Sequence, residues 1–287
     1  MTDTSRPPFE LKEKLDQIVV EIIRTIASVC EKLNIRFFLA GAVARDLVLA
    51  NIFGRSPGRK TNDLDFAFAV GSWEQYEQLK SGLLATGSFS SCANKVHRLF
   101  FHCAEGVEFI VDLIPFGRIA EQNQIAWPPN QDTIMNVAGF EEALASAIPV
   151  RINDSCILLV ASLPGLALLK LLAWKDRHGS DNRDAADFLK IVRDYADAGN
   201  EDRLFEKEPE LLEVLRYDTV AAGATLLGRD AALIATDETK QQVQDLLTTE
   251  KTKEALLRQM IQALGLSEEY FGGTTLLDRF TEGFFGR

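Results

Sequence analysis

The sequence lacks the long apolar run that a membrane-spanning helix or a secretory leader requires. No stretch approaches the roughly 18 consecutive apolar residues of a span. Charged residues interrupt the N-terminal region, and they are Glu10, Lys12, Glu13, Lys14 and Asp16. We therefore expect neither a signal peptide nor a membrane partner, and we expect a cytoplasmic protein.

Cysteine and histidine are few, and their spacing excludes the sites that they usually build. The four cysteines, Cys30, Cys92, Cys103 and Cys156, show no zinc-ligand spacing. Without a leader we expect reduced thiols rather than a disulfide framework. The three histidines form neither a ligand pattern nor a catalytic triad. Zinc and disulfide chemistry are therefore not expected.

Positive charge is also in short supply. The chain has 31 Lys and Arg against 42 Asp and Glu, a formal net charge of −11. This balance disfavours broad nucleic-acid binding, because clustered Lys and Arg capture a phosphate backbone. A local basic edge could still grip one RNA end, and its members would be Arg55, Arg59, Lys60, Lys170, Lys175 and Arg177.

The most informative stretch that is present is 61–68, where two carboxylates interrupt an apolar run of strand-forming residues. Side chains of a strand alternate between faces, so Asp63 and Asp65 share one face roughly 7 Å apart. The alternative is a solvated strand edge, but Phe66 and Phe68 favour burial. Adjacent buried anions need a cation between them, and hard divalent cations prefer carboxylate oxygens. The pair predicts a magnesium site.

A second acidic strand supports this prediction. Residues 96–103 and 107–114 are joined by a short loop that contains glycine, a pattern typical of a β-hairpin. Asp112 lies in the most apolar part of the second arm, where a lone carboxylate needs a partner. We predict that Asp112 is a third metal ligand. The alternative is a buried acid paired with Arg98 across the hairpin.

A turn of small residues upstream is a candidate phosphate site. The strand-like residues 37–40 lead into Gly41 and Ala42, and residues 43–53 follow as a predicted helix closed by Gly54. A strand that enters a helix through such a turn leaves backbone N–H groups free to receive phosphate.

The basic loop 54–60 stands directly before the paired acids. Its cations could close over a triphosphate, and the alternative is an ordinary flexible connection. In the preceding helix, Arg45 and Asp46 are either site residues or a pair on the surface.

The second half predicts two helices whose apolar faces carry charges. Ser162 can cap a helix in which Lys170 interrupts the apolar stripe, and a second helix places Asp184 and Asp187 on an apolar face. These charges could belong to a nucleotide site. Alternatively, Lys170 snorkels to the solvent, or the two acids hold Lys170 or Arg177 in a structural ion pair.

These elements predict an α/β (α+β) core followed by a helical lobe. With 287 residues and 46% hydrophobic content, the chain can bury a sizeable core. We place the core at residues 1–155, with an amphipathic helix over 10–33, a short helix over 140–147 and a strand over 148–152. Residues 156–287 would form the helical lobe, with helices broken at glycines.

The order of these motifs resembles the nucleotidyltransferase superfamily that includes DNA polymerase β. In that superfamily a glycine pair precedes a strand with paired acids, and a third acid on a later strand completes a two-metal site. The corresponding residues here are Gly41 and Ala42, then Asp63 and Asp65, then Asp112. Residues 39–47 look especially like the opening motif of the CCA-adding and poly(A) polymerases, although Ala42 stands where Gly or Ser is commoner.

The charges of the second half are similar in spacing to those of the AbiEii family of nucleotidyltransferase toxins. Members of that family carry a Lys-rich helix followed by a helix with an Arg/Lys-Asp-x-x-Asp pattern. The corresponding residues here are Lys170, Lys175, Asp176, Arg177, Arg183, Asp184 and Asp187.

The resemblance implies a polymerase β-like core with a mixed sheet, and Mg²⁺-dependent transfer of a nucleoside monophosphate from an NTP to an acceptor hydroxyl. Asp63 and Asp65 would bridge two ions, and Asp112 would ligate the ion that activates the acceptor. Lys170 would neutralise the β- and γ-phosphates. The implied nucleotide-binding residues are Gly41, Ala42, Arg45, Lys60, Lys175, Arg177, Asp184 and Asp187.

The implied acceptor is RNA, most simply a tRNA 3′ end, in a bacterial toxin or defence operon with a cognate antitoxin. Two alternatives stay open. A small-molecule nucleotidyltransferase of the aminoglycoside-modifying kind would suit an acidic chain, because its substrate is cationic. The other alternative is a catalytically silent, nucleotide-binding regulatory protein.

Overall fold

The computed structural model describes residues 7–59, 61, 63–103, 106–177, 179, 181–264 and 270–286. The chain divides into two compact units, the first comprising residues 1–44 and 60–161 and the second comprising residues 45–59 and 162–287. This division differs from the predicted one at two places. Strand residues 156–160 belong to the first unit, and the segment 45–59 belongs to the second.

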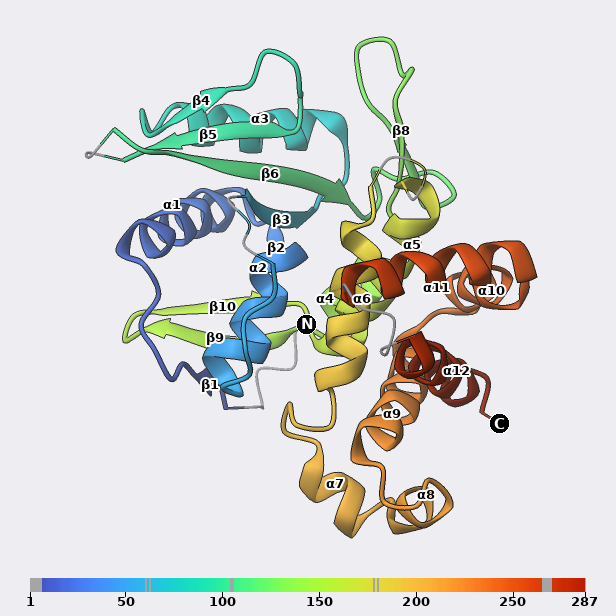
Figure 1. Ribbon diagram of the computed structural model, residues 1–287. Helices are drawn as coiled ribbons and strands as arrows, with labels where there is room; N and C mark the ends of the chain where they lie inside the picture. The colour runs from blue at the N-terminus through green and yellow to red at the C-terminus, as the bar shows by residue number, and fades with distance from the viewer. Residues whose placement is uncertain are drawn as a thin grey trace. The chain divides into compact units, whose positions relative to one another are not determined.

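The first unit is built on an eight-stranded mixed sheet (Figure 1). Its strands, in spatial order, are β1 (Phe9–Glu10), β9 (Ile148–Asn153), β10 (Cys156–Val160), β2 (Arg36–Ala40), β3 (Asp63–Ala69), β6 (Glu108–Phe116), β5 (Arg98–His102) and β4 (Phe89–Ser91). Three neighbouring pairs, β1 with β9, β10 with β2 and β3 with β6, are parallel, and the other pairs are antiparallel. The predicted mixed sheet is confirmed.

The strand register separates an apolar face from a face that carries the acids. On the first, Phe66 lies opposite Leu39 and beside Leu113, and all three side chains are fully buried. We assign the covering layer to helices α1 (Gln17–Leu33) and α3 (Trp73–Leu84), because they pack together and Tyr76 of α3 donates a hydrogen bond to Leu113 O at 3.1 Å.

The sheet face that carries Asp63, Asp65 and Asp112 is apolar at the end away from these acids. There Phe38 and Phe116 pack with Phe140 of helix α4 (Phe140–Ala145), with ring centroids 5.7–6.3 Å apart. Burial of these rings holds β2 and β6 on either side of β3. The paired acids therefore lie on a strand that is fixed from both sides.

Several predicted elements of this unit are confirmed, including the hairpin β5–β6, helix α4 and strand β9. The predicted N-terminal helix over 10–33 is too long. It begins only at Gln17, because the Asp16 side chain accepts the Ile18 N–H at 2.7 Å as an N-cap. Residues 9 and 10 instead pair with β9. The assignment of residues 156–160 to a helical lobe is also wrong, since they form β10 in the main sheet.

The predicted helix over 43–53 is longer and less regular than expected. It starts at Gly41 as α2 (Gly41–Asp46) and continues as a π-helical stretch, η1 (Leu47–Ile52). Gly54, at φ +73°, closes it as predicted, and its N–H donates to Ala50 O. A separate two-stranded hairpin, β7 (Gln124–Ala126) with β8 (Ile134–Asn136), was not predicted.

The second unit is helical throughout its regular elements, as predicted. Its helices after the segment 45–59 are α5 (Leu163–Arg177), α6 (Arg183–Asp194), α7 (Glu201–Glu206), α8 (Pro209–Val214), α9 (Thr219–Ile234), α10 (Asp237–Thr248), α11 (Glu250–Leu264) and α12 (Tyr270–Phe285). The sequence suggested helix breaks at Gly223 and Gly228. This prediction is wrong, because both glycines lie inside α9. A Cβ at Gly228 would collide with the backbone of α12, so this glycine permits close helix packing.

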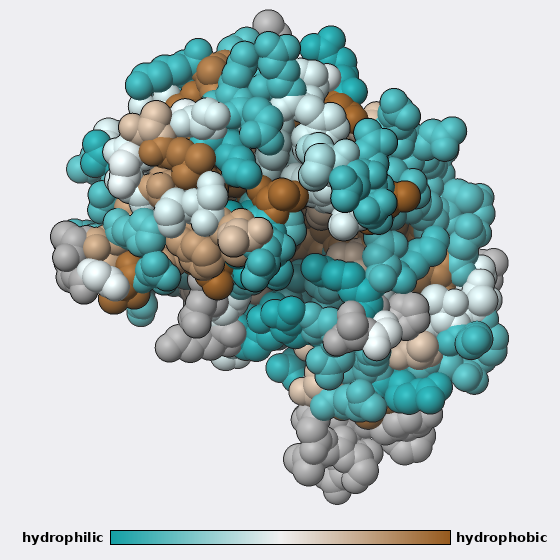
Figure 2. All heavy atoms as spheres, turned by 90° about the horizontal axis from the view of Figure 1, so that it is seen from above, coloured by the Kyte–Doolittle hydropathy of each residue, from teal (hydrophilic) through white to brown (hydrophobic). Residues whose placement is uncertain are grey.

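The surface seen in Figure 2 is mainly hydrophilic, with hydrophobic side chains in small separate areas. Over the described part of the chain, every helix is too short or too polar to cross a lipid bilayer.

Candidate active site

The predicted acids converge on the first unit's sheet. Asp65 on β3 lies directly beside Asp112 on β6 in the parallel register, and Asp63 is two residues earlier on the same face. Ligand oxygens of the three carboxylates all lie within 4.8 Å of one another. Asp112 is buried, and the other two are half-buried. The three acids thus form one compact group, as predicted.

Gly41 makes room for this group. Its φ of +69° lies in the left-handed region, and a Cβ there would collide with the Asp65 carboxylate. The neighbouring Ala42 is buried, at 2% exposure. On the other side, the Thr61 hydroxyl donates a hydrogen bond to Asp63. The turn therefore positions a carboxylate directly above the backbone at the start of α2.

Asp112 also forms the ion pair that the sequence left as an alternative. Arg98 Nε donates to Asp112 Oδ1 at 2.7 Å, and Arg98 Nη2 donates to Oδ2 at 2.6 Å. The hydrogen bond with Asp112 raises the pKa of the Arg98 guanidinium above its ordinary value. Such a bidentate pair fixes the orientation of the carboxylate. Arg98 is therefore a positioning residue for the third acid.

The donor set fits a hard divalent cation. Three carboxylates offer oxygen ligands at close quarters, which Mg²⁺ prefers, and like charges this close repel one another without a cation. The Arg98 pair does not remove this fit, because a carboxylate oxygen has more than one lone pair. The residues present could hold magnesium.

A second charged cluster, within the second unit, contains Lys170 together with Asp184 and Asp187 of α6. Lys170 is 7% exposed, and its Nζ lies 3.1 Å from Asp184 Oδ1 and 2.7 Å from Asp187 Oδ2. Arg177 Nη2 lies 2.7 Å from Asp184 Oδ2. The geometry favours the structural ion pair for Lys170, and its predicted contact with phosphates stays a prediction.

Arg45 joins the same cluster from the segment 45–59. It is 1% exposed and pairs with Asp187, so the surface-pair alternative is wrong, although Arg45 also pairs with Asp46 at 2.8 Å. Arg59 Nε lies 3.3 Å from Asp187 Oδ1. A Cβ at Gly58 would collide with the Arg45 guanidinium. Described residues of the basic loop are therefore anchored to α6.

The remaining predicted site residues are more scattered. Lys175 is half-exposed near the end of α5. Lys60 lies outside the described residues. Sequence reasoning missed the contact of Arg45 with Asp187, which joins residues 142 positions apart and has no local signal.

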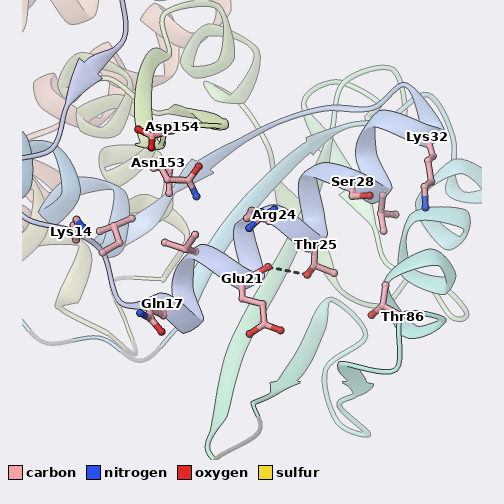
Figure 3. A pocket seen from close by; sticks show the side chains of 14 residues that line it. Lys14, Gln17, Glu21, Arg24, Thr25, Ser28, Lys32, Thr86, Asn153 and Asp154 are labelled. Atoms are coloured by element: carbon pink, nitrogen blue, oxygen red, sulfur yellow. Dashed lines mark hydrogen bonds between the residues drawn. The ribbon is translucent and has the colours of Figure 1, made fainter.

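A polar hollow of about 940 Å³ runs along α1 in the first unit (Figure 3). Arg24, Thr25 and Ser28 line it from the helix, Asn153 lines it from the end of β9, and Asp154 lines it from the β9–β10 turn. None of the predicted site residues is in its lining. The acid group and this hollow are separate features.

No protein-family model and no curated protein matches the chain. Among solved structures, a nucleotidyltransferase-like antigenic protein from Paracoccidioides brasiliensis is 18% identical, with 71% of this chain and 94% of that chain covered and a TM-score of 0.42. The enzyme ANT(2″)-Ia, solved with adenylyl-2″-tobramycin, is 15% identical, with 70% and 97% covered and a TM-score of 0.36.

The Thermotoga maritima CCA-adding enzyme, solved with tRNA, is 12% identical, with 91% of this chain and 69% of that chain covered and a TM-score of 0.25. These structural neighbours are nucleotidyltransferases. At such identities and TM-scores the likeness carries no conclusion about the substrate of this chain.

Proposed function

We propose that the chain is a magnesium-dependent nucleotidyltransferase that transfers a nucleoside monophosphate from an NTP to an acceptor hydroxyl. The observation that carries this proposal is the group of Asp63, Asp65 and Asp112, with ligand oxygens within 4.8 Å of one another on one sheet face. Three carboxylates at this separation offer the oxygen ligands that Mg²⁺ prefers.

Asp63, Asp65 and Asp112 would hold Mg²⁺, which when bound stabilises the attacking and leaving oxygens of a phosphoryl transfer. Gly41 keeps the space that Asp65 needs, and Arg98 fixes the orientation of Asp112. The backbone N–H groups at the start of α2 would bind phosphate, as expected at a helix N-terminus. In the second unit, the exposed guanidinium of Arg177 and the half-exposed Lys175 are the cations we propose for phosphate contact.

For the acceptor we propose RNA, in the form of a tRNA 3′ end, and an AbiEii-like toxin role with an antitoxin as partner. The support is the motif of residues 39–47, which resembles that of CCA-adding enzymes, and the charge spacing from Lys170 to Asp187. One observation favours a second candidate. The net charge of −11 would attract a cationic aminated sugar better than a polyanion.

One experiment separates these candidates. The purified chain is incubated with each labelled NTP and Mg²⁺, in parallel with total RNA and with an aminated sugar, and Asp65→Asn serves as the inactive control. Label on RNA that requires Asp65 supports the proposal. Label on the sugar alone would move the second candidate to first place, and label on neither acceptor would contradict transferase activity.

A further inference from the structure

A small aromatic hollow lies beside α3 in the first unit. Its volume is about 240 Å³, and its lining includes Trp73, Tyr76, Glu77, Lys80, Val96 and Trp127. Typical sites for drug-sized ligands measure about 300–1,000 Å³. This hollow therefore suits a single ring system rather than a whole oligosaccharide.

The aromatic wall of the hollow is fixed in place. The ring centroids of Trp73 and Trp127 are 5.3 Å apart, and each lies within 5.8 Å of the Tyr76 ring. Tyr76 is 1% exposed and Trp127 is 6% exposed, whereas Trp73 is half-buried. The Tyr76 hydroxyl is held by Leu113 O. A ligand ring would thus meet a rigid apolar surface, which reduces the entropy lost on stacking.

Two charged side chains of opposite sign, Lys80 and Glu77, line the hollow. Lys80 Nζ donates to Val96 O at 2.9 Å, so its ammonium stands at the rim. The ring of His97 lies 5.3 Å from that of Trp127. Lys80 at the rim is the cation that can contact a phosphate of a strand whose base enters the hollow.

The hollow and the acid group flank the start of the same strand. β5 begins at Arg98, which binds Asp112 on the acid face, and Val96 of the hollow is two residues earlier. The hollow and the acid group therefore both lie near the start of β5.

We propose that this hollow binds one nucleobase of a single-stranded RNA acceptor, upstream of its terminal hydroxyl, by stacking on the Trp73 and Trp127 wall. The inference rests on the proposed function, in which RNA is the acceptor. Base stacking on aromatic side chains is tolerant of sequence, so the hollow would set the position of the RNA end rather than its sequence.

The test is a double-mutant cycle between protein and RNA. Fluorescence anisotropy measures binding of a labelled single-stranded oligoribonucleotide, and of versions with one abasic ribose at each upstream position, without NTP. The proteins compared are the wild-type chain and the variants Trp73→Leu and Val96→Phe. Val96 is 42% exposed, and a Phe there would fill the hollow. Phe205→Leu is the matched control, because Phe205 is an aromatic residue that is 54% exposed. Melting curves establish that each variant is folded.

We expect one abasic position to weaken binding to the wild type by about tenfold. The same position should have no effect in Trp73→Leu or Val96→Phe, and the full effect in Phe205→Leu. Equal binding of all the RNAs by all the variants, or displacement of the RNA by an aminated sugar, would overturn the inference.

The two proposals fail separately. Suppose that the folded variants Trp73→Leu and Val96→Phe label RNA as well as the wild type does, and that no abasic position weakens binding. This result would contradict the proposed base site but would leave the proposed transferase activity standing. Base-dependent binding without any nucleotide transfer retains the hollow as an RNA site and removes the transferase.

Discussion

The two units both gather carboxylates, but they surround them differently. In the first unit three acids converge on one another, and Arg98 orients Asp112 from the side. In the second unit Asp184 and Asp187 of α6 are instead surrounded by cations from separate segments. Those cations are Arg45, Arg59, Lys170 and Arg177.

This difference separates a candidate metal centre from a structural network. Mutual repulsion among acids is relieved by a bound cation, so the first arrangement fits a divalent cation. A buried acid between cations already has its partners, and it costs stability when one partner is removed. The predictions below test each half of this contrast.

The largest expected effect is on catalysis in the first unit. Replacing Asp63 or Asp65 by Asn removes one charge from the proposed ligand set, and we expect nucleotide transfer to fall by about three orders of magnitude. The fold should survive, as circular dichroism would show. The control is Glu108→Gln, a 59% exposed acid on the same face of β6, which should keep full activity. Retained transfer by Asp65→Asn would break the contrast.

The largest expected effect on stability lies in the second unit. Asp187 is 1% exposed, and Asp187→Asn would leave its cationic partners buried without their acid. We expect the free energy of unfolding to fall by about 3–5 kcal/mol in chemical denaturation. Asp197→Asn is the control, because the pair of Asp197 with Arg55 is partly exposed and should contribute under about 1 kcal/mol. Equal losses in both variants would contradict a structural network.

Lys170 also tests whether the second cluster is structural, because the sequence analysis predicted that Lys170 contacts the triphosphate. Lys170→Met should lower the free energy of unfolding by about 3 kcal/mol, because Asp184 and Asp187 lose a shared buried partner. The measurement is chemical denaturation together with NTP titration. Unchanged stability with weaker NTP binding would restore the phosphate role.

A comparison of two glycines, Gly41 and Gly87, tests how the acid group is positioned. Gly41 and Gly87 both have a left-handed φ, but a Cβ at Gly41 would collide with the Asp65 carboxylate, whereas a Cβ at Gly87 would meet nothing within 4 Å. Each change to Ala should cost about 1–2 kcal/mol in backbone strain, measured by thermal melting. Gly41→Ala should also reduce transfer about a hundredfold by displacing Asp65. Equal activity of the two variants would remove Gly41 from the site.

The sequence was sufficient for features that depend on local pattern. Alternation along β3 placed Asp63 and Asp65 on one face, and a glycine-containing loop between apolar arms predicted the β5–β6 hairpin. Both follow from the period of a strand, which a single sequence displays directly.

Long-range contacts were beyond the same reasoning. The pairing of Arg45 with Asp187 depends on how the segment 45–59 packs on α6, and no local sequence pattern near either residue predicts it. Whether Asp112 would bind a metal or Arg98 could not be decided, because both strand neighbours of Asp112 had to be known. For β10, an apolar run of five residues gave no periodicity to distinguish strand from helix.

The smallest expected effect is a dependence of stability on pH through His97. Burial lowers the pKa of His97 below its ordinary 6.5, so the native state keeps the ring neutral. The unfolded chain therefore binds the proton first, and stability should fall as the pH drops below about 6.5. His97→Gln should reduce this acid-side loss in urea titrations, while His102→Gln, at a 40% exposed ring, should retain it. Identical profiles for both variants would contradict the assignment.

The most direct measurement is calorimetric titration of Mg²⁺ into the wild-type chain, Asp65→Asn and Glu108→Gln, without nucleotide. If the three convergent acids form the metal centre, the wild type and Glu108→Gln bind the ion with the same affinity, and Asp65→Asn loses that binding. Equal Mg²⁺ affinity in Asp65→Asn would contradict the account.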